Sequence, residues 1–317
     1  MKTKLDKYFR ISQRGSTIGT ELIGGATTFA TMAYILAYMT GAMSAVPGID
    51  LTGVLLCTAL ITAISCIAMG LVANAPIALA PVLVIPNLVA GMVASGEATY
   101  GQAFGTVAIS GIVFLLISVF KLRDLFARSL PKNIKIGIGG AVGLLIASIG
   151  LNTSGLAAAG EDGSFINFSD KSVQLGLIGL AIALLLTYLK ITVNGRTYKI
   201  KGALLISIVL TTIIGIPMGV TVLPENIFTR GALASIGNVA FQVDILGALK
   251  LSFVPFIIML LINDFFGTLG TGLAMAGKAG LLDEDGNFPA FGKVFLVDSS
   301  ATILGSLFGI TTVSCFA

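Results

Sequence analysis

One carboxylate lies in the middle of a long apolar stretch. The stretch runs from Phe256 to Gly272, and Asp264 is its only charged residue. A carboxylate is costly to place at membrane depth, so by default it marks a substrate or proton pathway. The glycines at 267, 270 and 272 allow close helix packing or a local opening of the backbone. Asp264 is therefore the first candidate for a group that binds a substrate and carries a proton.

A proline-interrupted stretch between residues 74 and 91 is the second candidate region. Pro76, Pro81 and Pro86 each remove a backbone donor, so they cannot all lie in one regular helix. Irregular backbone inside a membrane is tolerated only where it lines a cavity or is buried in protein. Such a segment points to the binding site of a transporter. A kinked packing helix is the alternative.

The remaining reactive residues form no catalytic or metal-binding pattern. Cys57, Cys66 and Cys315 are scattered in apolar segments without ligand spacing. The chain has no histidine, so any proton relay must use carboxylates. We find no nucleophile–base pair, and we expect neither enzymatic activity nor a cofactor other than a proton gradient. Asp298 lies in the opening part of the ninth apolar run, and we expect it to cap that helix.

The composition sets the class of protein. Charged residues make up 11% of the chain and hydrophobic residues 56%, whereas a soluble domain carries about 25% charge. The mean hydropathy is +1.00. This predicts an all-α polytopic membrane protein with the lipid bilayer as its solvent; an unusually apolar soluble protein is the alternative. The net charge of +4 does not indicate nucleic-acid binding, because the basic residues fall between the hydrophobic runs.

The apolar runs predict about nine spans, since one span needs about 20 apolar residues. No cleavable signal peptide is expected, because residues 1–19 form a polar, basic arm. Sixteen of the nineteen Lys and Arg residues fall in alternate connections, on the side of the N-terminus. Cytoplasmic loops collect such residues, which predicts a cytosolic N-terminus in the cell membrane. The predicted spans are about 21–46, 51–72, 74–91, 103–120, 136–151, 173–189, 203–220, 248–275 and 294–309, with the start of a tenth at 310–317.

Five motifs occur in order along nearly the whole chain. They are residues 20–36 (TELIGGATTFATMAYIL), 74–81 (NAPIALAP), 131–144 (PKNIKIGIGGAVGL), 264–271 (DFFGTLGT), and 278–286 with 298–305 (KAGLLDEDG, DSSATILG). Together they resemble the AzgA-like purine permeases, a branch of the nucleobase–cation symporter-2, or nucleobase–ascorbate transporter, superfamily.

The resemblance implies a fold of fourteen spans in two inverted repeats of seven, with a core and a gate domain. It divides this chain into a basic arm (1–19), a first repeat (20–220), an extracellular connection (221–246) and the start of a second repeat (247–317), so the second half looks truncated. Short extended pieces of the third and tenth segments should meet near the middle of the membrane, where the purine binds. The resemblance also implies import of adenine, guanine or hypoxanthine with a proton, by a homodimer.

A purine site needs a carboxylate, backbone amides from broken segments and an aromatic or apolar wall. We expect Asp264 to bind a ring N–H and carry the proton, with Phe265 as a wall, although such aromatic residues more often serve packing. By position, the third segment contributes Ile85, Pro86 and Asn87, and the start of the tenth contributes Thr312, Phe316 and Ala317.

The chain departs from the family pattern in three places. The first helix has Tyr-Met-Thr at 38–40, where relatives have Asn-Pro after Ile-Leu. The third segment reads Val-Leu-Val-Ile-Pro at 82–86, where relatives have Gly-Met-Gly-Leu-Asn, and Gly267 stands where a second acid often lies. Two alternatives stay open. The altered third segment favours a transporter of the same fold for another nucleobase or a small anion, and the missing second half favours a truncated chain that transports nothing.

Overall fold

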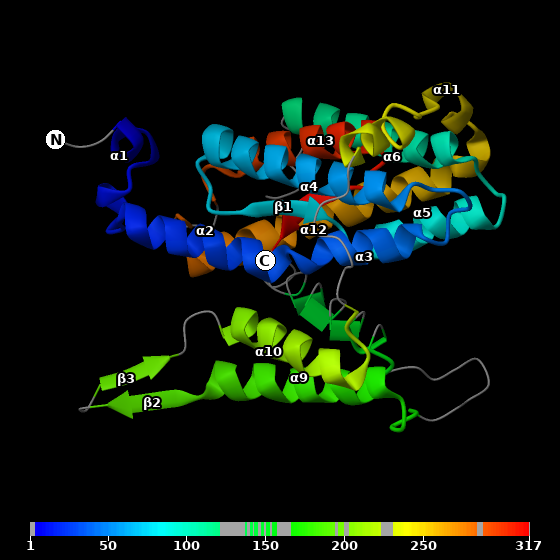
Figure 1. Ribbon diagram of the computed structural model, residues 1–317. Coiled ribbons are helices and arrows are strands. Elements are labelled where there is room, and N and C mark those ends of the chain that lie inside the picture. Colours follow the sequence, from blue (N-terminus) through cyan, green and yellow to red (C-terminus); the bar gives the residue numbers. More distant parts are fainter. Residues whose placement is uncertain are drawn as a thin grey trace. The chain divides into compact units, whose positions relative to one another are not determined.

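The computed structural model describes residues 4–120, 166–193, 196–199, 203–222, 231–283 and 288–316, with scattered residues between 137 and 156. The chain divides into two compact units. One comprises Met1–Thr31 and Leu145–Thr229, and the other comprises Met32–Leu144 and Arg230–Ala317. Helices dominate both, as the composition predicts (Figure 1).

The second unit holds the stretches that the sequence singles out. Most of its helices are apolar, and two of its segments are extended. In chain order its elements are α3 (Tyr34–Met43), α4 (Leu51–Ala68), the π-helical turn η2 (Met69–Ala73), β1 (Ala78–Pro81), α5 (Val84–Ala94), α6 (Tyr100–Val119), η3 (Ala232–Asn238), α11 (Ile245–Ala248), η4 (Leu251–Phe253), α12 (Val254–Lys278), α13 (Phe291–Leu307) and β4 (Val313–Phe316).

Side-chain caps define where two of these helices begin. Thr99 and Gln102 form a capping box at the start of α6, in which each side chain bonds the backbone N–H of the other. Asp50 caps α4 by accepting from the N–H of Gly53 at 3.1 Å, and its second oxygen accepts from Asn238 Nδ2 at 2.8 Å. Together these bonds, that from Asn238 first, hold the pKa of the Asp50 carboxyl below its usual range.

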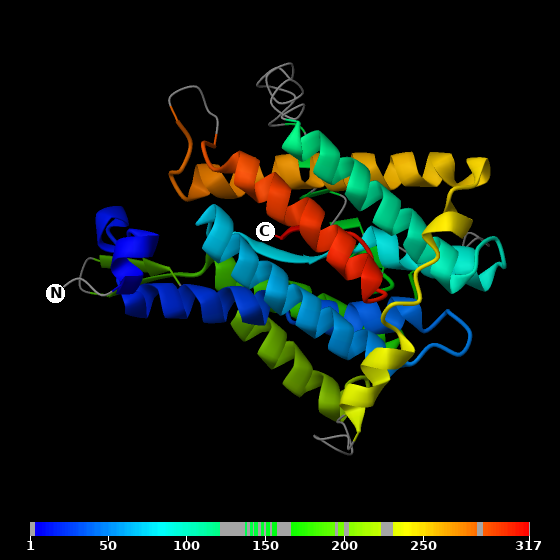
Figure 2. The ribbon, with the colours of Figure 1, turned by 90° about the horizontal axis from the view of Figure 1, so that it is seen from above.

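The central helix of this unit is α13. It lies against α6, α4, η2, β4 and α12, and Figure 2 shows it running alongside α6. At Gly111 of α6 a Cβ atom would come within 3.0 Å of side-chain atoms of Thr302 and Ile303, so the two helices approach closely because this residue has no side chain. Helix α13 can carry several polar residues because it packs against protein on most of its faces. Its buried residues are Val294, Phe295, Val297, Asp298, Ser299, Ala301, Thr302, Gly305 and Ser306.

The predicted break in the third segment is confirmed. Asn74 adopts a left-handed conformation after η2, residues 78–81 form β1, and α5 starts only at Val84. Pro86 lies in the first turn of α5, where its missing N–H would have had no partner within the helix. Strand β1 pairs antiparallel with β4, with Ala78 opposite Phe316 and Pro81 opposite Val313. The extended pieces of the third and tenth segments therefore meet, as the resemblance implies.

In the first unit, α9 (Lys171–Tyr188) and α10 (Ala203–Met218) pack against each other. A Cβ at Gly179 would lie 2.9 Å from Thr211 Cγ2, so this packing is close. Residues 190–201, which separate two of the predicted spans, contain a hairpin of β2 (Lys190–Val193) and β3 (Arg196–Lys199). The signal was present in the sequence, because Asn194-Gly195 is typical of two-residue hairpin turns. The unit also holds α1 (Lys4–Phe9), η1 (Ser12–Arg14) and most of α2 (Ile18–Met32).

Five helices in the described part of the chain are long and apolar enough to cross a membrane. Three other predicted spans are shorter or broken helices: α5, α10 and the polar α13. The predicted span at 136–151 is described only at scattered residues, so the total number of spans stays a prediction. The five qualifying helices are Ile18–Met43, Leu51–Ala73, Tyr100–Val119, Lys171–Tyr188 and Leu251–Lys278.

Candidate functional site

Asp264 lies in the middle of α12 and is 1% exposed. Its Oδ2 atom lies 2.9 Å from the hydroxyl of Thr302 on α13. Its Oδ1 atom is also buried and has no hydrogen-bond partner among the described residues. One oxygen of this carboxylate thus contacts Thr302, and the other is buried without a hydrogen bond to it among the described residues.

Asp298 is a second carboxylate of the same site, and the prediction that it caps its helix is wrong. Helix α13 begins at Phe291 with Ala290 at the N-cap, which places Asp298 two turns inside it. The apolar run that predicts this span already begins at residue 294, before Asp298, and the helix itself begins earlier still, at Phe291. Asp298 is fully buried, and its Oδ2 accepts a hydrogen bond from the Thr268 hydroxyl. Its Oδ1 has no partner among the described residues.

The two aspartates and two threonines form crossed pairs between α12 and α13. Each helix carries an Asp followed four residues later by a Thr, and this spacing places both side chains on one helix face. Asp264 of α12 pairs with Thr302 of α13, and Asp298 of α13 pairs with Thr268 of α12. The repeated Asp-x-x-x-Thr spacing is the signal that could have identified Asp298, Thr268 and Thr302 from the sequence.

Both threonines also contact strand β4. The Thr302 hydroxyl oxygen lies 2.9 Å from the carbonyl oxygen of Val313 and accepts from its N–H at 3.1 Å. The Thr268 hydroxyl lies 2.7 Å from the hydroxyl of Ser314. Each carboxylate is therefore linked through one threonine to one residue of the strand that pairs with the broken third segment.

The site has more buried hydrogen-bonding capacity than the described residues use. The Oδ1 atoms of both aspartates and the hydroxyls of Thr311 and Thr312 are buried without partners among them. Most buried polar atoms in proteins are paired, since leaving one unpaired is unfavourable. Carboxylate oxygens accept and hydroxyls can do either, so this arrangement suits a small molecule that presents N–H groups.

Phe265 packs in an aromatic cluster beside the carboxylates. Its ring centroid lies 5.3 Å from that of Phe295, 5.4 Å from Phe266 and 6.0 Å from Phe114. The ring is largely buried in this cluster. Its contacts are thus those of the packing role that the sequence left open, and its predicted role as a site wall stays a prediction.

The predicted residues of the third segment have different surroundings. Ile85 and Pro86 are buried at the start of α5, and Ile85 belongs to the main hydrophobic core. Asn87 is exposed, and its side-chain amide donates to Tyr38 Oη at 2.7 Å. Tyr38 Oη in turn donates to the carbonyl of Leu83 at 2.6 Å, which ties α3 to the turn before α5. Asn87 thus belongs to a helix-anchoring network.

The predicted residues of the tenth segment lie on or beside β4. The carbonyl of Thr312 accepts from the N–H of Val82 at 2.9 Å, which extends the pairing of the two strands. Phe316 lies opposite Ala78, with its ring centroid 6.2 Å from that of Tyr34. Ala317 lies outside the described residues. Asp264 and the tenth segment are therefore brought together, and Thr302 is the link.

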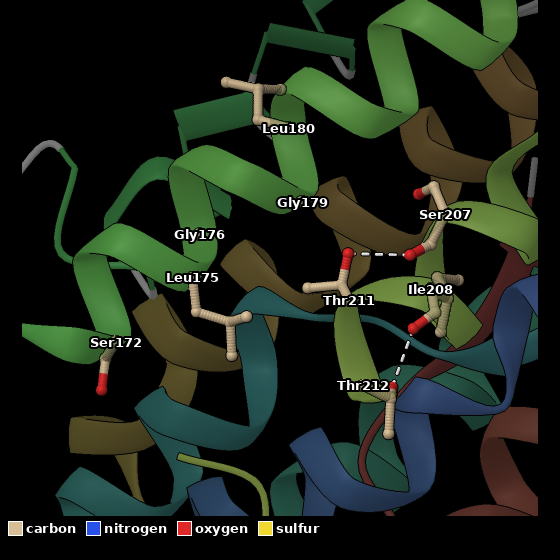
Figure 3. A pocket seen from close by; sticks show the side chains of 9 residues that line it. All are labelled: Ser172, Leu175, Gly176, Gly179, Leu180, Ser207, Ile208, Thr211 and Thr212. Carbon is tan, nitrogen blue, oxygen red and sulfur yellow. Dashed lines mark hydrogen bonds between the residues drawn. The ribbon is translucent and has the colours of Figure 1, made fainter. Parts of the chain in front are cut away.

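A groove in the first unit is a weaker candidate. Ser172, Gly176, Gly179, Thr211 and Thr212 are among its lining residues. Figure 3 shows that its two threonine hydroxyls bond back to their own helix, Thr211 to the carbonyl of Ser207 at 2.7 Å and Thr212 to that of Ile208 at 2.8 Å. These hydroxyl protons are not available to a ligand. Neither unit, over the residues described, gathers three His, Cys, Asp or Glu side chains into a metal site.

Comparison with known proteins gives consistent similarities over nearly the whole chain. Residues 19–317 match the model of the xanthine/uracil permeases, which is described as a permease family. A Methanocaldococcus jannaschii protein that is named only as a permease is 34% identical over 98% of this chain and 70% of its own length. The adenine permease AdeP of Escherichia coli is 31% identical over 98% of this chain and 68% of its own. The guanine/hypoxanthine permease PbuG of Bacillus subtilis is 30% identical over 98% and 70%.

Proposed function

The chain belongs to the xanthine/uracil permease family, and from this premise we propose that it carries a purine nucleobase across the cell membrane, with Asp264 as the group that binds the base. Two of the relatives are named for adenine and for guanine and hypoxanthine. These three bases are accordingly the first candidates for the substrate. The homologues are transporters rather than enzymes, which fits the lack of a nucleophile–base pair in the sequence.

One observation carries the proposal: Asp264 is buried, yet only one of its oxygens has a partner among the described residues. A purine presents ring N–H donors on a flat face, and Asp264 Oδ1 is an acceptor suited to one of them. Because Thr302 holds Oδ2, the carboxylate keeps its orientation while Oδ1 serves the base. The Oδ1 of Asp298 and the hydroxyl of Thr312 are also buried without partners among the described residues, and they are further candidates to bind the base.

We propose proton symport as the energy source, with Asp264 as the carrier. With no histidine in the chain, carboxylates must hold the proton. Ionisable groups inside a membrane protein mark such pathways, and Asp264 and Asp298 are both fully buried. A proton on Oδ2, the oxygen that Thr302 contacts, leaves Oδ1 able to accept from the base. Proton and base can then occupy this one side chain together, as symport requires.

The finer assignment also remains our proposal: an AzgA-like permease with a cytosolic N-terminus, two inverted repeats of seven spans and a homodimeric assembly. One internal feature supports the repeat. Helix α4 precedes the extended β1 as α13 precedes the extended β4, and in the predicted numbering these elements lie seven spans apart. Two such helix–strand pairs meeting through their strands are what inverted repeats produce.

Uptake of labelled adenine and hypoxanthine tests the proposal. The chain would be expressed in cells that lack their own purine permeases, with membrane insertion checked by an epitope tag. Saturable uptake that a protonophore abolishes and sodium replacement leaves unchanged is the expected result. If a pyrimidine or a small anion is taken up and purines neither enter nor compete, the substrate belongs to that other class. An inserted chain without uptake of any of these compounds would contradict the proposal.

A further inference from the structure

We propose that Thr302 is a positioning residue that couples the protonation of Asp264 to strand β4. This rests on the proposed function for its meaning in transport, but its chemistry depends only on the contacts of Thr302. The side chain is fully buried in α13, between the carboxylate on α12 and the strand. It touches both the proton carrier and the backbone that the tenth segment contributes to the site.

The hydroxyl of Thr302 has more acceptors around it than it has protons. Its oxygen lies 2.9 Å from Asp264 Oδ2, 2.9 Å from the Val313 carbonyl oxygen and 3.1 Å from the Val313 nitrogen. The N–H of Val313 is a donor, so it occupies a lone pair of the hydroxyl oxygen. The single hydroxyl proton is left with two acceptors and can be donated well to only one of them.

Strand pairing cannot satisfy Val313 in another way. In an antiparallel pair, residues that exchange hydrogen bonds alternate with residues whose N–H and carbonyl point away from the partner strand. The N–H of Val82 donates to the carbonyl of Thr312, so the next pair, Pro81 with Val313, is of the second kind. The amide and carbonyl of Val313 therefore face α13, where Thr302 meets both of them.

The protonation state of Asp264 decides how this shortage is resolved. When Asp264 is protonated, its carboxyl donates to the Thr302 oxygen, Thr302 donates to the Val313 carbonyl, and every group is satisfied. When Asp264 is ionised, the carboxylate attracts the hydroxyl proton, and the Val313 carbonyl loses its donor inside a dry site. Loss of the proton thus weakens the attachment of β4 to α13 at the residue opposite Pro81.

Few other ionisable groups lie near the contacts among Asp264, Thr302 and Val313. Asp298 on α13 is bonded to Thr268 and close enough to Asp264 for the two carboxylates to repel each other, and Cys315 on β4 interacts with both. Helix α6, which packs on α12 and α13, carries no Asp, Glu, Lys, Arg or Cys. Over the described part of the chain, Asp264 and Asp298 are therefore the groups whose titration acts on β4, and Thr302 is bonded to the first.

Three variants at one position test the inference. T302V keeps the shape but removes the hydroxyl, T302S keeps the hydroxyl, and T302C substitutes a weaker donor. We expect initial purine uptake by T302V to fall about tenfold, the fold-change that loss of a hydrogen bond to a charged group represents. Its ratio of uptake at acid and neutral pH should approach one. T302S should keep the wild-type pH profile, and T302C should lie between the two.

Infrared difference spectroscopy of the purified chain provides a readout that does not need a substrate. A pH step should give a carboxyl C=O band that D264N removes, together with an amide change from β4. In T302V, or in T302A if T302V does not fold, the carboxyl band should move to higher wavenumber and the amide change should disappear. A T302V or T302A spectrum like that of the wild type would overturn the inference, whether or not the chain transports purines. If the wild-type chain takes up no purine but T302V changes the spectrum as expected, the proposed function is refuted and the role of Thr302 is not.

Discussion

The paired strands β1 and β4 are each bonded to the helix that precedes them by one side chain of that helix. On α4, the Cys66 thiol bonds both the N–H and the carbonyl of Leu79, each at 3.3 Å. On α13, the Thr302 hydroxyl bonds both backbone groups of Val313. Leu79 and Val313 each belong to strand pairs whose backbone groups face away from the partner strand. One short side chain thus binds the outward-facing backbone groups of each strand, and we call the Cys66–Leu79 contact the β1 joint and the Thr302–Val313 contact the β4 joint.

The difference between the two joints lies in what else the side chain touches. Thr302 also contacts the Asp264 carboxylate, whereas the hydrogen bonds described for Cys66 go to Leu79. A thiol is a weaker donor and acceptor than a hydroxyl, so the joint at β1 is weaker but has no ionisable partner. The comparison teaches that one half of the sheet is attached independently of protons, and the other half through a proton-carrying residue.

Removing the carboxylate from the β4 joint should have the largest effect. D264N keeps the size of the side chain but cannot bind a proton as a carboxylate does. We expect purine uptake at the background level, with membrane insertion unchanged by epitope labelling. E97Q, which neutralises an exposed carboxylate in the same unit, is the matched control and should transport normally. Wild-type uptake by D264N would refute the assigned role.

The second carboxylate should matter less, because it reaches β4 through a side chain rather than through the backbone. In D298N the asparagine oxygen can still accept from Thr268, but without charge. We expect uptake to fall about tenfold, in line with weakening one hydrogen bond to a charged group. Kinetics at several pH values would measure it, and a loss as complete as that of D264N would show that the two aspartates act as one unit.

The β1 joint should respond to substitution without any change in proton dependence. C66A removes both contacts to Leu79, and C66S keeps a donor at the same place. We expect C66A to raise the KM for uptake about threefold, since a weak neutral hydrogen bond is lost. Its acid-to-neutral uptake ratio should equal that of the wild type. A C66A profile flattened like that of T302V would remove the distinction between the two joints.

The smallest effect should come from the glycines beside each joint. A Cβ at Gly305 of α13 would lie 3.1 Å from Val313 Cγ2, whereas a Cβ at Gly70, just after α4, would meet nothing within 4 Å. G305A should therefore displace β4 slightly and change the KM about twofold, as expected for a contact worth a few tenths of a kcal/mol. G70A is its control and should leave the KM unchanged. Equal effects of the two would indicate a general response of the helices.

Local patterns were sufficient to predict the class of protein and one element of the site. Apolar runs of span length predict most of the helices, because helix formation in a membrane depends mainly on local composition. Prolines at 76, 81 and 86 predict the broken third segment, because a missing N–H acts at its own position. Asp264 stands out for the same kind of reason, since a lone carboxylate in an apolar run is costly wherever it packs.

Only the tertiary structure decided how these elements combine. Asp298 reads as a cap from the sequence but lies inside α13, because the start of that helix depends on a partly polar first turn. The hydrogen bond of Asn87 to Tyr38, a partner 49 positions away, has no signal in the sequence, and its role in the site stays a prediction. The crossed pairing of Asp264 with Thr302 and Asp298 with Thr268 depends on how α12 lies against α13. Hydrogen bonds between helices are set by their packing, and a single sequence records the side chains of each helix but not which faces meet.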